Sequence, residues 1–179
     1  MIDDKKKIAA GLSANDGASV VSRQAVSDRQ LIEEALEARK LAYAPYSGFM
    51  VGAALLTATG KVYRGCNIES ASYSPSNCAE RTAFFKAVSE GERDFSAIAV
   101  VGAPADAVFG RFGFAYPCGV CRQVMMEFCD PQTFRIITAE GYDSYTNLTL
   151  RELLPNGFGP SNLASGSRAH ETVLEDDGK

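Results

Sequence analysis

The chain has 179 residues, of which 46% are hydrophobic and 22% charged, a composition typical of one ordinary globular domain. Eighteen basic and twenty-two acidic residues leave a net charge of −4, which argues against a protein that grips nucleic acid through a broad basic surface. No apolar run is long enough for a membrane span, and no signal-peptide pattern follows the N-terminus. We therefore expect a cytoplasmic protein that acts on a small molecule, with no nucleic-acid or membrane partner.

The two ends of the chain differ in composition from its middle. Residues 1–26 and 164–179 are rich in small and polar residues and show no sustained apolar period. We expect an N-terminal disordered tail over 1–26, one domain over 27–163 and a polar C-terminal tail over 164–179. The single histidine, His170, lies in the C-terminal tail, so histidine chemistry elsewhere in the chain is nearly excluded.

The first predicted elements are a helix and a hairpin. Ser27-x-x-Gln30 is a capping box, and apolar residues at helical spacing follow it as far as Tyr43, so the sequence predicts a helix that stops at Pro45. Two short apolar or alternating runs then flank a turn that ends in glycine, and they predict strands over 50–57 and 61–68.

Helices and strands alternate through the rest of the chain. The predicted elements are a helix over 78–90 capped by Asn77, a strand over 95–102, a helix over 118–129, strands over 133–139 and 142–148, and a short helix capped by Thr149-x-x-Glu152. This order predicts an α/β fold in which helices cover a mixed five-stranded sheet. The helix N-termini that follow strands gather at one sheet edge, where ligands are usually bound.

Both central helices are predicted to begin at a cysteine, and five cysteines without a secretory signal favour a metal or catalytic site over disulfides. Cys118 and Cys121 are three residues apart at a helix start, so both sulfurs can reach one zinc ion, and Cys78 supplies a third. Three protein ligands leave the fourth zinc position open, which is typical of a catalytic site.

Two charged residues, Glu80 and Arg81, lie two and three positions after Cys78. Three thiolates outweigh the charge of a zinc ion by one, and Arg81 is predicted to donate hydrogen bonds to the ligand sulfurs; the alternative is a surface ion pair. Glu80 is the candidate general acid and base, which takes a proton from a water acidified by the metal. The alternative for Glu80 is that it closes a capping box begun by Asn77.

Cys78-Ala79-Glu80 together with Pro117-Cys118-Gly119-Val120-Cys121 resembles the signature of the cytidine deaminases, specifically the small homotetrameric type, over about residues 27–163. The resemblance implies a three-layer α/β/α fold, a homotetramer, and one zinc per subunit on Cys78, Cys118 and Cys121, with Glu80 moving the proton. It also implies hydrolytic deamination of cytidine and deoxycytidine to uridine and deoxyuridine, with release of ammonia, in pyrimidine salvage.

Three further segments, residues 44–55, 65–73 and 153–160, are similar to the same family. They imply that Phe49 stacks near the pyrimidine, that Asn67 and Glu69 hold the ribose hydroxyls, and that the Ala71 backbone contacts the base. We also expect Tyr73, at the end of the second segment, to bind substrate. The third segment implies that Phe158 reaches into the site of a neighbouring subunit.

Other readings of the cysteines remain open. Cys118-Gly119-Val120-Cys121 also resembles a redox dithiol, and a structural zinc site completed by Cys66 or Cys129 is a second alternative. We otherwise expect Cys66 and Cys129 to be buried, unreactive thiols. Within the deaminases, a polynucleotide editor and an enzyme for a nucleoside-like antibiotic are further alternatives. The aromatic stretch over 101–116 is predicted to wall the pocket or a subunit contact.

Overall fold

The computed structural model describes residues 25–108 and 110–163; His170, the C-terminal tail and nearly all of the predicted N-terminal tail lie outside these residues. The named elements, in chain order, are α1 (Asp28–Arg39), β1 (Phe49–Thr57), β2 (Val62–Cys66), α2 (Ala79–Ser89), β3 (Phe95–Pro104), α3 (Gly119–Phe128), β4 (Arg135–Ala139), β5 (Tyr145–Thr149) and α4 (Leu150–Leu153). None of the helices within the described ranges has the length and apolar character that crossing a membrane requires.

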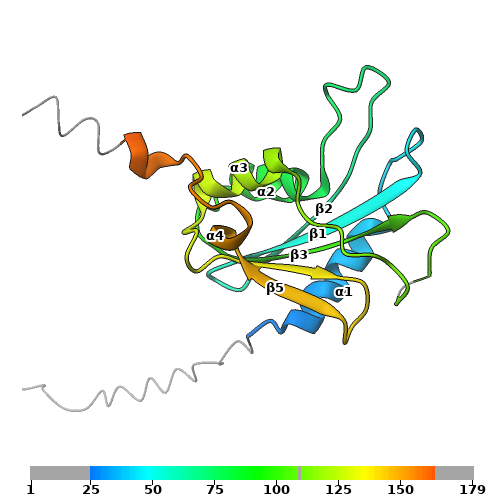
Figure 1. Ribbon diagram of the computed structural model, residues 1–179, viewed down its shortest axis with the longest axis horizontal. Helices are drawn as coiled ribbons and strands as arrows, with labels where there is room; N and C mark the ends of the chain where they lie inside the picture. The colour runs from blue at the N-terminus through cyan, green and yellow to red at the C-terminus, as the bar shows by residue number, and fades with distance from the viewer. Residues whose placement is uncertain (1–24, 109, 164–179) are drawn as a thin grey trace, which may run out of the picture.

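The five strands form one mixed sheet in the order β2-β1-β3-β4-β5. β1 is antiparallel to both β2 and β3, β3 is parallel to β4, and β4 is antiparallel to β5. Figure 1 shows α1 on one face of the sheet and α2 and α3 on the other, so the predicted three-layer α/β/α fold is confirmed. Each face has its own apolar core: one around Leu31 and Ile32 of α1, the other around Phe84 of α2 and Met125 of α3.

The predicted start of the first helix is correct, and its predicted end is wrong. The capping box is present, since the Ser27 hydroxyl accepts from the backbone of Gln30 and the Gln30 side chain accepts from the backbone of Ser27. The helix nevertheless ends at Arg39, well before Pro45. Tyr43 instead donates its backbone N–H to the Asn67 carbonyl and pairs with the segment that follows β2. A long-range backbone pairing therefore replaces the last predicted helical turn.

The start of α2 also differs from the prediction. Cys78 is the N-cap residue and makes no side-chain cap, whereas Asn77 forms an antiparallel bridge with Ile68 and donates its side-chain amide to Thr82. The expected Asn77 cap is therefore wrong, and so is the alternative in which Glu80 closes a capping box. Glu80 is the second residue of the helix, which leaves its carboxyl group free for another role.

Strand limits shift by a few residues where the sequence offered no sharp stop. Strand β4 begins at Arg135 instead of 133, and β5 spans Tyr145–Thr149 instead of 142–148. A turn closed by the Ser144 carbonyl, which accepts from the backbone N–H groups of Glu140 and Gly141, occupies the intervening residues. The expected helix cap at Thr149 is present, with the Glu152 carboxylate accepting from the Thr149 backbone at 2.7 Å.

Two glycines in the sheet let the helices approach it closely. A Cβ on Gly52 of β1 would lie 2.0 Å from the carbonyl oxygen of Ala35 in α1. A Cβ on Gly65 of β2 would lie 2.4 Å from both the carbonyl oxygen of Ala79 and the backbone nitrogen of Ala83 in α2. Because these atoms are backbone, a side chain could fit only if the helix moved away from the sheet.

We expect Gly65→Ala to lower the free energy of unfolding by about 3 kcal/mol, because the extra methyl group displaces α2 from the sheet. Denaturant unfolding followed by circular dichroism measures the change. Gly113→Ala is the matched control, since no heavy atom lies within 4 Å of the added Cβ, and its effect should stay within about 0.5 kcal/mol. Equal stability of the two variants would contradict the close packing of α2 on β2.

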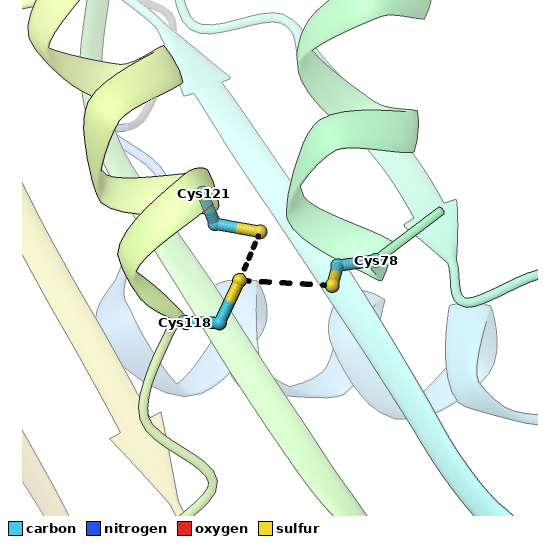
Figure 2. A group of neighbouring side chains, drawn as sticks. All are labelled: Cys78, Cys118 and Cys121. Atoms are coloured by element: carbon cyan, nitrogen blue, oxygen red, sulfur yellow. Dashed lines mark hydrogen bonds between the residues drawn. The ribbon is translucent and has the colours of Figure 1, made fainter. Parts of the chain in front are cut away.

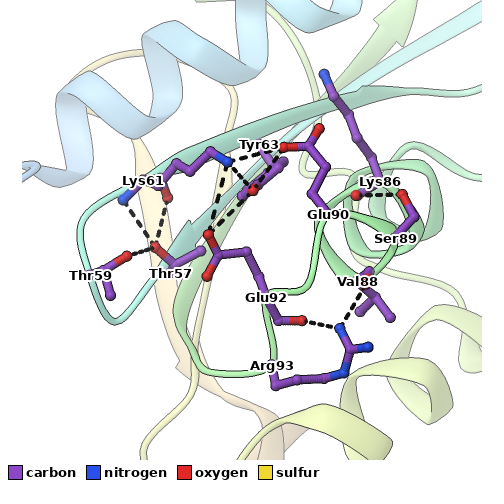
Figure 3. A network of polar contacts seen from close by, with 10 residues as sticks. All are labelled: Thr57, Thr59, Lys61, Tyr63, Lys86, Val88, Ser89, Glu90, Glu92 and Arg93. Carbon is purple, nitrogen blue, oxygen red and sulfur yellow. Dashed lines mark hydrogen bonds and ion pairs between the residues drawn. The ribbon is translucent and has the colours of Figure 1, made fainter.

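A polar network ties the far end of α2 to the β1–β2 hairpin (Figure 3). The Lys61 ammonium group donates to the hydroxyl of Tyr63 and, at 3.0 Å, to the carboxylate of Glu90, the residue that caps the helix C-terminus. The Tyr63 hydroxyl lies 3.1 Å from the same carboxylate, and its ring is almost fully buried. The helix is thus held at its C-terminal end by this network and begins, at its other end, at Cys78.

Candidate active site

Three cysteine sulfurs meet where α2 and α3 begin (Figure 2). Cys78 and Cys118 are the N-cap residues of the two helices, and Cys121 lies in the first turn of α3. The Sγ atoms of Cys78 and Cys118 are 3.9 Å apart, those of Cys118 and Cys121 are 3.5 Å apart, and all three lie within 4.8 Å of one another. The sequence therefore predicted this cluster correctly from residues forty positions apart.

The donor set fits a zinc ion. Sulfur ligands about 2.3 Å from a tetrahedral zinc ion lie about 3.8 Å from each other, close to the Cys78–Cys118 and Cys118–Cys121 separations. The hydrogen bond with Cys121 and the guanidinium group of Arg81 lower the pKa of the Cys78 thiol well below its usual range. A cluster that favours a thiolate before any metal arrives is chemically suited to a divalent cation.

Arg81 lies against this cluster as expected. Its Nη2 atom is 3.9 Å from the Cys78 sulfur and donates to the Ser76 carbonyl at 3.3 Å. Its Nε atom is buried and has no hydrogen-bond partner among the described residues. The structure therefore gives no support to a surface ion pair for Arg81, and it brings the positive charge to the sulfurs.

The two remaining cysteines stand apart from the cluster. Within the described residues, the group that can hold a metal contains Cys78, Cys118 and Cys121 and no fourth ligand. Cys129 is buried in the apolar core, as expected. Cys66 is only half-buried, and its sulfur lies 3.3 Å from the Leu41 carbonyl oxygen. A structural site closed by either residue and a simple dithiol pair both fit this geometry less well than an open three-sulfur site.

Glu80 places a carboxyl group beside the sulfurs. The residue is 4% exposed, and burial raises the pKa of its carboxyl group to about 7. A carboxyl group with a pKa near neutrality is well matched to accepting and returning a proton. Glu80 also lines the same cavity as Cys78 and Cys118, so a molecule bound there would meet the carboxyl group and the sulfurs together.

That cavity has a volume of about 480 Å³, within the range of small-molecule sites. Phe49, Asn67 and Glu69, three of the predicted substrate-binding residues, also line it. Phe114, Ala115 and Tyr116 line it as well, so part of the aromatic stretch before α3 walls the pocket. An aromatic and apolar lining with a few polar groups suits a flat, polar-edged ring.

Asn67 and Glu69 are both held by the loop and strand that carry Phe49. The Asn67 side-chain amide donates to the Phe49 carbonyl and accepts from the Val51 backbone, each at 2.8 Å. The Glu69 carboxylate accepts from the backbone N–H groups of Tyr46 and Ser47 and from the Ser47 hydroxyl. These bonds, with Ser47 first, lower the pKa of Glu69 and keep it ionised.

Three of the predicted site residues do not line the cavity in the single chain. Ala71 and Tyr73 are exposed, and Phe158 is 57% exposed, with its carbonyl oxygen accepting from the Gln123 side chain. Two contacts of the site were not predicted: the Ser47 hydroxyl donates to Glu69, and the Ser76 backbone carbonyl accepts from Arg81. No local pattern marks these serines: Glu69 lies twenty-two positions from Ser47, and the bond from Arg81 goes to the backbone carbonyl of Ser76, which does not depend on the residue type.

Comparison with known proteins matches both the fold and the site. A family model described as the cytidine and deoxycytidylate deaminase zinc-binding region matches residues 25–137. The cytidine deaminase of Sporosarcina psychrophila is 50% identical over 135 residues, which cover 75% of this chain and 93% of that protein. The cytidine deaminase of Halalkalibacterium halodurans is 52% identical over 132 residues, covering 73% and 94% of the two chains.

A solved structure gives the same result in three dimensions. The crystal structure of cytidine deaminase from Burkholderia pseudomallei superposes with a TM-score of 0.66 at 47% identity, covering 74% of this chain and 99% of that one. The matched domain is a zinc-binding one, and zinc is the cofactor for which the three-sulfur cluster is suited. The chain therefore belongs to the cytidine and deoxycytidylate deaminase family.

Proposed function

We propose that this enzyme hydrolyses cytidine and deoxycytidine to uridine and deoxyuridine, releasing ammonia, as a step of pyrimidine salvage. The observation that carries the proposal is the placement of the buried Glu80 carboxyl group and the Cys78 and Cys118 sulfurs on one cavity. The relatives named cytidine deaminase, which match most of their length to this chain, support the choice of substrate.

Cys78, Cys118 and Cys121 hold the zinc ion in this proposal, and Arg81 offsets the excess negative charge of three thiolates. When zinc is bound, it would lower the pKa of a water molecule at the site, so that the water can act as a nucleophile near neutral pH. The remaining tasks belong to the protein: it must place C4 of the cytosine ring beside the nucleophile and move protons to the ring and to the leaving amine.

Glu80 moves those protons. Its carboxylate takes a proton from the attacking water and delivers it to N3 of the ring, which makes C4 electrophilic. The water oxygen bonds to C4 as the ring takes up this proton. The Glu80 carboxylate then takes the remaining proton of that oxygen and transfers it to the amino nitrogen, and the C4–N bond breaks to give ammonia and the uracil product. The pKa of about 7 leaves both the protonated and the ionised form of Glu80 accessible at neutral pH, which supports this double role.

Phe49, Asn67 and Glu69 orient the nucleoside. The Phe49 ring, which lines the cavity, stacks near the pyrimidine, and the Asn67 amide and the Glu69 carboxylate pair with ribose hydroxyls. An ionised Glu69 is a strong acceptor for a hydroxyl group. The acidic net charge and these sugar contacts favour a free nucleoside over a polynucleotide.

We further propose that residues 27–163 form the catalytic domain of a cytoplasmic homotetramer. Tyr43, Tyr46, Ile68, Tyr73 and Phe158 are all exposed in the single chain, and apolar side chains in such numbers suit a subunit interface. Ala71, Tyr73 and Phe158 contact substrate in this assembly only from a neighbouring subunit, because they do not line the cavity of their own chain. Five unpaired cysteines suit a reducing compartment.

Ammonia release from cytidine by the purified protein tests the proposed function. We expect turnover that disappears when a strong chelator strips the metal and returns when zinc is restored, because the nucleophile depends on zinc. Uridine formation followed by the change in ultraviolet absorbance provides a second readout. A folded, zinc-loaded protein that releases no ammonia from cytidine or deoxycytidine would contradict the proposal.

A further inference from the structure

The hydroxyl group of Ser47 links two residues of the cavity wall. It donates a hydrogen bond to Oε1 of Glu69 at 2.5 Å and accepts one from the backbone N–H of Phe49 at 3.0 Å. Ser47 does not itself line the cavity that contains Glu80, whereas Glu69 and Phe49 do. A single small side chain that does not line the cavity therefore joins Phe49 and Glu69, which do.

The two oxygens of the Glu69 carboxylate are held in different ways. Oε2 accepts from the backbone N–H groups of Tyr46 at 2.9 Å and of Ser47 at 3.2 Å. Oε1 accepts only from the Ser47 hydroxyl among the described residues. The two backbone bonds restrain Oε2, and the bond from the Ser47 hydroxyl restrains Oε1. The Ser47 hydroxyl thus sets the plane of the carboxylate.

A tight turn next to Ser47 shapes the local backbone. Gly48 has a φ of 65°, which favours glycine, and its N–H donates to the Ala44 carbonyl at 3.0 Å to close a turn. The neighbouring strand edge is fixed separately, because the Asn67 side chain bonds the backbone of Phe49 and Val51. Loss of the Ser47 hydroxyl should therefore release the carboxylate and leave the cavity wall in position.

We propose that Ser47 is a positioning residue that orients the Glu69 carboxylate toward a ribose hydroxyl of the substrate. This inference rests on the proposed function, in which Glu69 contacts the sugar. Ser47 touches neither the base nor the reacting atoms, so its effect should fall on the binding of nucleosides that carry the hydroxyl groups and not on the chemical step.

The test compares nucleosides with and without the 2′ and 3′ hydroxyl groups of the sugar. In Ser47→Ala, we expect KM for cytidine to rise about fivefold with kcat within about twofold of the unchanged enzyme. KM for 2′,3′-dideoxycytidine, which has no hydroxyl for Glu69 to hold, should be the same in both proteins. Ser47→Thr retains a hydroxyl group and should restore KM for cytidine.

Ser144→Ala is the matched control, since Ser144 makes the same kind of bond, from its hydroxyl to the Glu140 carboxylate at 2.7 Å, outside the cavity. It should change neither KM. An equal rise for both nucleosides in Ser47→Ala would show general distortion, and no rise for cytidine would show that the bond has no role; either result overturns the inference.

Calorimetric binding of uridine and 2′,3′-dideoxyuridine separates this inference from the proposed function. These ligands need no turnover, and Ser47→Ala should weaken only uridine. A protein that releases no ammonia but shows this selective loss would overturn the proposed reaction and retain the role of Ser47. Active protein without the selective loss would retain the proposed reaction and overturn the role of Ser47.

Discussion

Replacement of Glu80 by glutamine is expected to reduce kcat for cytidine by roughly 10³-fold, with the zinc content and the fold unchanged. The amide has nearly the same size and fits the same buried position, but it cannot accept a proton from water and return it to the ring and the amine. Steady-state ammonia release measures the loss, and elemental analysis measures zinc per chain.

Glu127→Gln is the control for this experiment. Glu127 is an exposed residue of α3 that does not line the cavity, so the same chemical change there should leave kcat unaltered. An active Glu80→Gln protein would eliminate the proposed proton transfer. A Glu80→Gln protein that had lost its zinc would instead show that the carboxyl group supports the metal site.

Replacement of Cys121 by serine is expected to lower zinc affinity by about 100-fold or more and to remove activity in proportion. Cys121 is 1% exposed and lies 3.5 Å from the Cys118 sulfur, so no other described side chain takes its place. A serine hydroxyl stays protonated at neutral pH and cannot replace a thiolate. Competition with a fluorescent zinc chelator measures the affinity.

Cys66→Ser provides the matched control for the metal site. The Cys66 sulfur lies near the Leu41 carbonyl oxygen and outside the three-sulfur cluster, and a serine hydroxyl can donate to the same carbonyl. Zinc affinity and activity should both be preserved. Comparable zinc loss in the two variants would favour a four-sulfur structural site over the open catalytic one.

Much of the site could be predicted because its chemistry is local in sequence. Cys118 and Cys121 share a helix start, and Glu80 follows Cys78 by two residues, so helical geometry alone brings each group to one end of a helix. The α/β pattern then indicates that both helix starts lie at the same sheet edge. The prediction of these residues therefore required no knowledge of side-chain contacts between distant segments.

The remaining details depend on contacts that a sequence does not display. The first helix ends at Arg39 because Tyr43 pairs with the backbone beyond β2, and Asn77 fails as a cap because Ile68 holds it in a bridge. Ser47 meets Glu69 across twenty-two positions, which no local pattern marks. In each case a long-range bond overrides or adds to a local preference.

The origin of the zinc ligands on two separate helices has a consequence for the chain as a polymer. Forty positions, including all of β3, separate Cys78 from Cys118, so a bound ion closes a long loop as a covalent cross-link would. By the chain-entropy relation used for disulfides, a loop of this length restricts the unfolded ensemble by about 4 kcal/mol. A bound ion would therefore cross-link the starts of α2 and α3, as a disulfide would, without oxidation of any cysteine.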